Sequence, residues 1–130
     1  MNDKISNLII SIKNAGMRGI DTITVPYSNL TLAILEVLER EGYVSGITKK
    51  GKKVAKTLEV GIVYDEARQP RVSGVERVSK FSRRVYSGFK NIHSVKSGYG
   101  KMIITTPKGI MTDLDAKKQR VGGETLFKIW

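Results

Sequence analysis

Two short polar turns near the end of the sequence carry the side chains best suited to chemistry. They comprise Thr105, Thr106, Lys108 and Gly109, followed by Gly122, Gly123 and Glu124. Hydroxyl groups donate and accept hydrogen bonds, which suits base edges and the 2′-hydroxyl groups of an irregular RNA. A carboxylate repels phosphate but accepts hydrogen bonds from base amino groups. These residues are therefore predicted to bind RNA, although the threonines also suit a strand and residue chemistry alone leaves Glu124 undecided.

The overall charge points to the same kind of partner. There are 23 Lys and Arg residues against 12 Asp and Glu, a formal net charge of +11, and such a field attracts polyanions. Nucleic acid is the first interpretation and an anionic membrane surface the second. Arg83 and Arg84 suit bidentate phosphate contacts, and Tyr86 suits either stacking on an unpaired base or a place in the core. The lysine-rich turn at 49–53 fits either a phosphate contact or a solvated loop.

Residues for catalysis or metal binding are scarce. The absence of cysteine excludes disulfides and thiolate ligands, and His93, the only histidine, has no companions at ligand spacing. Asp113 and Asp115 fit Mg²⁺, but acids at the start of a helix are favoured electrostatically in any case. Lys108 and Gly109 lack the remainder of a P-loop. We therefore predict no enzyme activity, no cofactor and no metal site.

The first half of the sequence predicts the order helix, strand, helix, strand, strand. Apolar residues at helical spacing follow a cap at residue 2 or 3 and stop near residues 15–16. A short β-branched strand precedes a second helix, which is capped by residue 28 or 29 and ends at residue 42. Alternating apolar residues on both sides of the lysine-rich turn then predict a hairpin.

Residues 65–70 contain turn formers without apolar periodicity, so they are the predicted junction between two domains, 1–64 and 65–130. The predicted elements of the second domain are strands at 72–78, 101–106 and 126–130, and one short helix capped by Thr112. The fold class is therefore α+β, with two small α/β domains. No run approaches the roughly 18 apolar residues that span a bilayer, so a soluble, cytoplasmic protein is expected.

Several stretches together resemble the S-eight family of small-subunit ribosomal proteins, in its bacterial form. The stretches that carry the resemblance are 105–113, Ala116, 121–124, 3–15, 25–28, 42–43 and 78–86. Glu124 is typical of the bacterial branch, because archaeal and eukaryotic relatives tend to have arginine after the paired glycines. Two positions depart from the family pattern. Pro107 replaces a common serine and removes a backbone donor, and Phe81 replaces a common proline.

The resemblance implies a structural constituent of the ribosome rather than an enzyme. Such a protein binds the central domain of 16S ribosomal RNA, takes part in assembly of the small (30S) subunit and contacts neighbouring ribosomal proteins. In the family the C-terminal half recognises an irregular RNA helix, a role that passes here to Thr105, Thr106, Lys108, Gly109 and Glu124. The N-terminal half contacts a second RNA helix through positions that match Lys13, Asn14, Pro26 and Ser28. Bacterial relatives can also bind their own messenger RNA and repress its translation.

Two alternatives belong to other functional classes. A basic DNA-binding module would insert the second helix into a groove, but Glu36, Glu39 and Glu41 on that helix would repel phosphate. A nuclease would need a cluster of carboxylates or a usable histidine, and the sequence offers neither.

Overall fold

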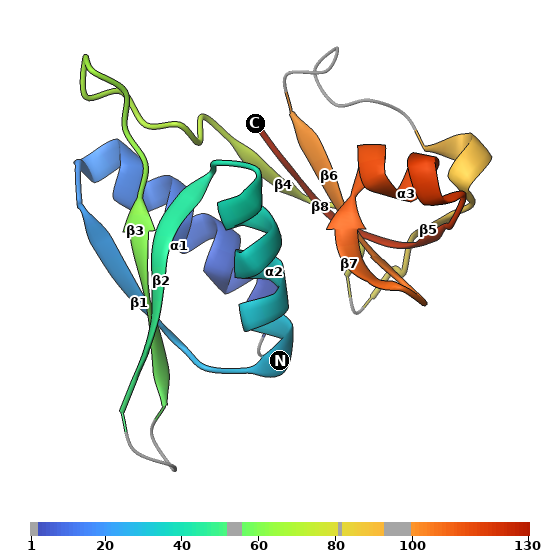
Figure 1. The fold of residues 1–130 in the computed structure, drawn as a ribbon, viewed down its shortest axis with the longest axis horizontal. Helices are drawn as coiled ribbons and strands as arrows, with labels where there is room; N and C mark the ends of the chain where they lie inside the picture. The colour runs from blue at the N-terminus through green and yellow to red at the C-terminus, as the bar shows by residue number, and fades with distance from the viewer. Residues whose placement is uncertain (1–2, 52–55, 81, 93–99) are drawn as a thin grey trace. The chain divides into compact units, whose positions relative to one another are not determined.

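The computed structural model describes residues 3–51, 56–80, 82–92 and 100–130. The chain divides into two compact units, Met1–Ser73 and Gly74–Trp130, and each unit contains its own antiparallel sheet and at least one helix (Figure 1). The α+β fold class is confirmed. The structure groups residues 65–73 with the first unit, whereas the sequence placed them at the start of the second.

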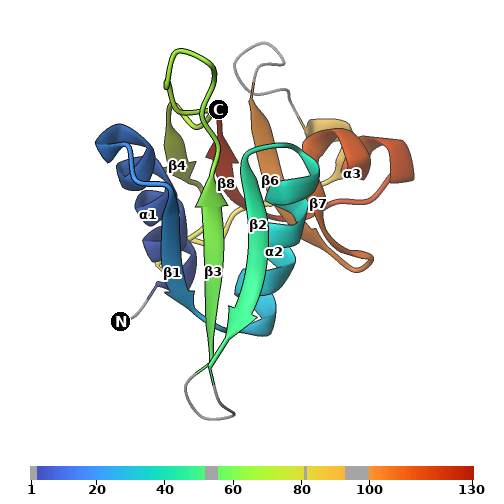
Figure 2. The ribbon, with the colours of Figure 1, turned by 60° about the vertical axis from the view of Figure 1, so that its left-hand side comes forward.

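The first unit has the predicted order of helix, strand, helix, strand, strand. Its elements are α1 (Lys4–Arg18), β1 (Thr22–Pro26), α2 (Asn29–Arg40), β2 (Val44–Lys50) and β3 (Thr57–Ile62). The strands lie in the order β1-β3-β2, and both helices cover the same face of the sheet (Figure 2). Ile12, Ile34 and Leu58 lie between these layers and are completely buried, so the core depends on apolar packing.

Side-chain caps start both of these helices. Asp3 accepts a hydrogen bond from the Ser6 amide at 3.1 Å, and Ser28 accepts one from the Thr31 amide at 3.0 Å. Each cap satisfies a backbone donor that has no partner within the helix. Both residues were among the candidate caps in the sequence.

The prediction that the first helix ends at residues 15–16 is wrong. Helix α1 continues to Arg18, and Gly19 ends it in the left-handed conformation with φ 69°. Gly16 lies inside the helix, where a Cβ atom would come within 2.8 Å of the Pro70 side chain. This glycine therefore provides space for the segment that follows the first sheet, a packing requirement that local sequence does not reveal.

A hydrogen bond and an ion pair connect the segment after β3 to the residues that follow α1. The Tyr64 hydroxyl lies 2.6 Å from the carbonyl oxygen of Ile20. Arg68 stacks on the Tyr64 ring, 4.1 Å from the ring centroid, and forms an ion pair with Asp21. These contacts explain why residues 65–73 group with the first unit.

The second unit is mostly β with one short α-helix, as predicted. Its elements are β4 (Val75–Arg77), β5 (Tyr86–Ser87), the 3-10 helix η1 (Phe89–Asn91), β6 (Lys101–Thr106), β7 (Gly109–Thr112), α3 (Asp113–Gln119) and β8 (Gly123–Ile129). The sheet order is β4-β8-β6-β7, and β5 also pairs with β8. Thr112 caps α3 by accepting a hydrogen bond from the Asp115 amide at 3.3 Å, as expected. The closing strand begins at Gly123, earlier than predicted.

A bulge in β8 adjusts its pairing with β6. Ile103 lies opposite Phe127, whereas the next residue, Ile104, lies opposite Thr125, so Leu126 is the additional residue. Ile103 and Ile104 point to opposite faces because they are adjacent in a strand, and both are completely buried. The prediction that this strand is buried on both sides is therefore confirmed.

Candidate nucleic-acid interface

Three predicted site residues lie side by side across the second sheet. Glu124 of β8 is paired with Thr105 of β6 on one side and with Tyr86 of β5 on the other. Directly paired residues of antiparallel strands point to the same face of a sheet, so an aromatic ring, a carboxylate and a hydroxyl form one row, named here the recognition row. Tyr86 is 69% exposed, which rules out the core position that the sequence left open.

Two side chains hold the Glu124 carboxylate in place. Arg84 donates to Glu124 Oε2 at 2.9 Å, and the Ser79 hydroxyl donates a hydrogen bond to the same oxygen. The Glu124 side chain is still 14% exposed, so part of it reaches the surface. Ser79 was not among the predicted site residues, because nothing in its sequence neighbourhood indicates that it meets a residue in the last strand.

These surroundings keep Glu124 ionised. Partial burial raises the pKa of the carboxyl group, but hydrogen bonds from Ser79 and Arg84, together with the charges of Arg84 and Arg77, outweigh that effect. The pKa of Glu124 therefore lies below its usual value. At neutral pH the group is a carboxylate, which can only accept hydrogen bonds.

The turn between β6 and β7 uses one of the predicted hydroxyl groups internally. Thr106 Oγ1 donates to the Gly109 carbonyl oxygen at 2.8 Å and accepts from the Lys108 amide at 3.1 Å. Gly109 has φ 113°, a conformation that residues with side chains rarely adopt. Thr106 and Gly109 thus shape the turn, Lys108 is exposed on it, and Pro107 leaves both hydrogen bonds intact.

The paired glycines allow neighbouring strands to approach closely. A Cβ atom on Gly122 would collide with the carbonyl oxygen of Ser87, and one on Gly123 would collide with that of Thr105. Any side chain would push β8 away from β5 or β6. The structure therefore assigns the glycine pair a packing role, in addition to the RNA contact that the sequence predicts for these two residues.

Arg83 and Arg84 lie in the loop that precedes β5. The amides of Lys80 and Arg83 bond to each other's carbonyl oxygens at 2.9 and 3.1 Å, which closes the loop at its base. Lys80, Arg83 and Arg84 are all exposed. Arg84 contacts Glu124, so this loop brings a cationic side chain to the recognition row.

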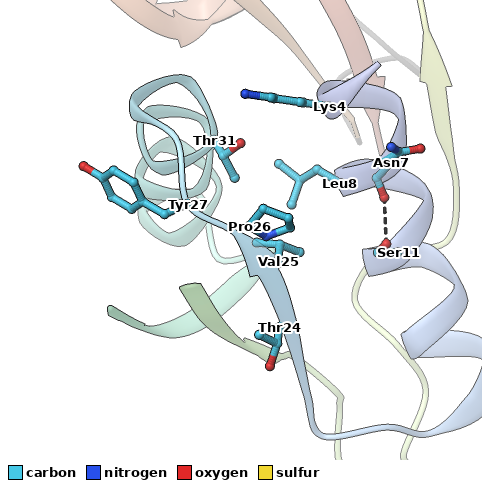
Figure 3. Close-up of a pocket in the computed structure, with 9 residues that line it drawn as sticks. All are labelled: Lys4, Asn7, Leu8, Ser11, Thr24, Val25, Pro26, Tyr27 and Thr31. Carbon is cyan, nitrogen blue, oxygen red and sulfur yellow. Dashed lines mark hydrogen bonds between the residues drawn. The ribbon is translucent and has the colours of Figure 1, made fainter. Parts of the chain in front are cut away.

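The predicted site residues of the first unit lie in α1 and around the start of α2. Lys13 is half-buried and Asn14 is exposed on α1. Pro26 lines a pocket of about 170 Å³, together with residues of α1 such as Lys4, and Figure 3 shows its ring beside Leu8. The Ser28 hydroxyl is occupied by the helix cap, because it also donates to Thr31 Oγ1 at 2.8 Å.

Two lysines flank Tyr27 at the base of the lysine-rich turn. The ammonium groups of Lys49 and Lys56 lie 4.9 and 5.6 Å from the centroid of the Tyr27 ring. Lys50 instead pairs with Glu59 at 2.8 Å. Lys49 and Lys56 therefore both lie against the Tyr27 ring, while a phosphate contact by the lysine-rich turn stays a prediction.

The residues considered for metal chemistry do not converge in the part of the chain that the structure describes. No group of three or more His, Asp or Glu residues there could hold a metal ion. Asp113 is 2% exposed and accepts a hydrogen bond from the Met102 amide at 3.3 Å, which fits its interpretation as a structural acid. His93, Phe81, Lys52 and Lys53 lie outside the described residues.

Across residues 3–51, 56–80, 82–92 and 100–130, no helix combines the length and the apolar character required to cross a bilayer.

Comparisons with known proteins identify the family of this chain. The family described as Ribosomal protein S8 matches residues 3–130. The chain is 47% identical over 128 residues to the small ribosomal subunit protein uS8 of Mycoplasmopsis agalactiae, with 98% of this chain and 97% of that protein covered. The uS8 proteins of Mycoplasmopsis synoviae and Corynebacterium kroppenstedtii are 44% and 40% identical, and each match covers 100% of this chain and 98% of the relative. The chain therefore belongs to the ribosomal protein S8 family.

Proposed function

We propose that this chain is a structural component of the small ribosomal subunit, where it binds the central domain of 16S ribosomal RNA and supports subunit assembly. Its relatives are named small ribosomal subunit proteins. The observation that supports RNA binding most directly is the recognition row, in which Thr105, Glu124 and Tyr86 share one face of the sheet. The ribosome is a cytoplasmic particle in bacteria, which is where we expect the protein to act.

The recognition row would supply specificity, and the surrounding cations would supply adhesion. The Glu124 carboxylate can accept hydrogen bonds from base amino groups, the Thr105 hydroxyl can bond to a base edge or a 2′-hydroxyl, and the Tyr86 ring can stack on an unpaired base. Arg83 and Lys108 are exposed in the adjoining loops, where they can neutralise phosphates without reading sequence.

A negative charge at the centre of the row favours irregular RNA over a regular duplex. In a regular A-form helix the phosphates form the outer surface, and Glu124 would be repelled by them. Splayed or unpaired bases instead present amino groups that a carboxylate can bind. The row is therefore suited to a distorted helix, which agrees with the role that the family resemblance implies.

The first unit would contact a second segment of ribosomal RNA. Asn14 is exposed, and Pro26 and Lys13 are accessible at the surface of this unit. Because Ser28 is engaged in capping α2, its contribution would come from backbone groups or from the shape of the turn. This contact is secondary to the one made by the second unit.

Membership of a ribosomal protein family identifies the chain as a structural protein and not an enzyme. The DNA-binding alternative finds no support, because Glu36 and Glu39 are exposed on α2 and would face phosphate in any groove.

Footprinting of the purified protein on a central-domain fragment of 16S RNA tests the proposed function. Glu124→Ala and Thr105→Val each remove polar atoms of the recognition row, and we expect each to weaken specific protection by about tenfold or more. Lys118→Ala is the matched control, because Lys118 is exposed on α3, which packs on the opposite face of the sheet from Thr105. Full protection by both site variants would refute the proposed site.

The same surface would serve a messenger RNA that folds like the ribosomal site, and we propose that this chain can repress its own translation in that way. A gel-shift comparison of the two RNAs tests this role. Binding of the messenger fragment no tighter than that of an unrelated hairpin would exclude it.

A further inference from the structure

Ser79 is a completely buried polar residue beside the recognition row. It follows β4, and its amide donates to the carbonyl oxygen of Thr125 at 3.1 Å. Its hydroxyl lies between the Val85 amide, at 3.1 Å, and Glu124 Oε2. A serine therefore connects the base of the loop before β5 with the central carboxylate of the proposed RNA site.

The direction of these hydrogen bonds follows from their chemistry. The Val85 amide can only donate, so Ser79 Oγ must be its acceptor. The hydroxyl proton of Ser79 is then directed to the Glu124 carboxylate, which can only accept. Because the hydroxyl has one proton, the two hydrogen bonds can run only from Val85 to Ser79 and from Ser79 to Glu124. This arrangement holds the carboxylate in one orientation.

The two carboxylate oxygens of Glu124 consequently differ. Oε2 receives the hydrogen bond from Ser79 and another from Arg84 at 2.9 Å. Within the described residues, Oε1 receives no side-chain or backbone hydrogen bond. One oxygen is thus used for positioning, and the other keeps its acceptor capacity.

The two groups that hold Oε2 also differ in their surroundings. Arg84 has a side chain that is 44% exposed, so its ion pair is weakened by salt and by the freedom of a long side chain. Ser79 is completely buried, where a hydrogen bond to a charged group is stronger and has fixed geometry. Ser79 is therefore the more rigid of the two supports.

We propose that Ser79 is a positioning residue for RNA recognition: its buried hydroxyl holds Glu124 Oε2 and thereby aims Oε1 at the amino group of an unpaired base. This role rests on the proposed function of the recognition row. Ser79 itself touches no RNA and acts only through Glu124.

The test compares Ser79→Ala with Thr125→Val in the full chain. Thr125 is a suitable control because it is also a buried hydroxyl residue of this sheet, but its hydroxyl bonds to the Val85 carbonyl oxygen and not to Glu124. We expect Ser79→Ala to bind the 16S central-domain fragment roughly tenfold more weakly in gel shifts. Thr125→Val is expected to bind within about twofold of the wild type, because Val85 keeps its bond from the Thr125 amide.

A second readout separates positioning from general destabilisation. NMR titration of the Glu124 carboxyl carbon should show a higher pKa in Ser79→Ala than in the wild type, because a bond to the charged form is lost. Arg84 and Arg77, the charged groups that act on Glu124, remain in both proteins. Thr125→Val should leave this pKa unchanged. If Ser79→Ala does not fold, Ser79→Cys replaces it, since a thiol is similar in size but a poor donor.

Each outcome either supports or overturns the proposal. Folded Ser79→Ala with wild-type affinity, or a wild-type Glu124 that titrates at its ordinary pKa, overturns it. If Glu124→Ala weakens binding but Ser79→Ala does not, only the role of Ser79 is wrong. If Glu124→Ala binds as tightly as the wild type, the recognition row itself is misplaced, and the role of Ser79 is rejected with it.

Discussion

Replacing Gly123 with alanine tests whether the glycine pair is required for strand packing. The new Cβ atom would lie 1.9 Å from the carbonyl oxygen of Thr105, whereas real Cβ atoms essentially never come within 3.0 Å of another heavy atom. Strands β6 and β8 must therefore separate by about 1 Å, which breaks roughly two ladder hydrogen bonds at about 1 kcal/mol each. With the added strain, we expect a loss of about 2 to 4 kcal/mol in the free energy of unfolding.

Urea unfolding followed by tryptophan fluorescence is the appropriate assay. The chain has one tryptophan, Trp130, which lies in the second unit, so its signal reports on the sheet that contains Gly123. Gly88→Ala is the matched control, because a Cβ atom there meets nothing within 4 Å and its φ of −73° suits any residue. The control should stay within about 0.5 kcal/mol of the wild type or be slightly more stable. An equally small effect of Gly123→Ala would refute the packing role.

Three further predictions concern other parts of the molecule. Tyr64→Phe removes the hydroxyl that reaches the Ile20 carbonyl oxygen and should lower the stability of the first unit by about 1 kcal/mol in circular-dichroism melts; no change would mean that this contact is replaced by water. The folded pKa of Glu124 is depressed, so its stabilising contribution is present above the unfolded pKa of about 4.3 and is lost as pH falls through the folded value. The stability difference between the wild type and Glu124→Gln should therefore shrink below about pH 4, and a constant difference would contradict the assignment. Replacing Lys49 and Lys56 together by alanine should reduce the salt slope of RNA binding by about 1.4 to 1.8 if both contact phosphate, whereas Lys50→Ala, which removes a paired lysine, should change it less; an unchanged slope would identify the turn as a solvated loop.

Local signals in the sequence predicted the three α-helices and their starts well, whereas β5, β7 and the early start of β8 were not predicted. Asp3 and Ser28 were each one of two adjacent candidate caps and Thr112 was the single candidate for its helix, and in all three the donor that the cap satisfies lies three residues away. The end of α1 was misjudged because Gly16, a poor helix former, is retained for its packing against Pro70. Contacts that depend on distant segments override such local preferences.

The members of the proposed site were recognisable individually, but their arrangement was not. Turn chemistry and family resemblance indicated Thr105 and Glu124, and the register then placed them opposite each other. Ser79 was missed because it lies 45 positions from Glu124 in sequence, and a serine between apolar and basic neighbours has no distinctive pattern. The close contacts that a Cβ atom on Gly122 or Gly123 would make likewise depend on the spacing between strands. That spacing cannot be read from the amino-acid composition.

The pairing of β8 with several other strands also affects how the protein folds while it is being synthesised. This strand pairs with β4, β5 and β6, yet it is the last of the described strands to emerge from the translating ribosome. The first unit has all its strands by residue 62 and can fold while translation continues. The other sheet lacks its central member until residues 123–129 are made, so a nascent chain halted before them would expose unpaired strand edges to aggregation.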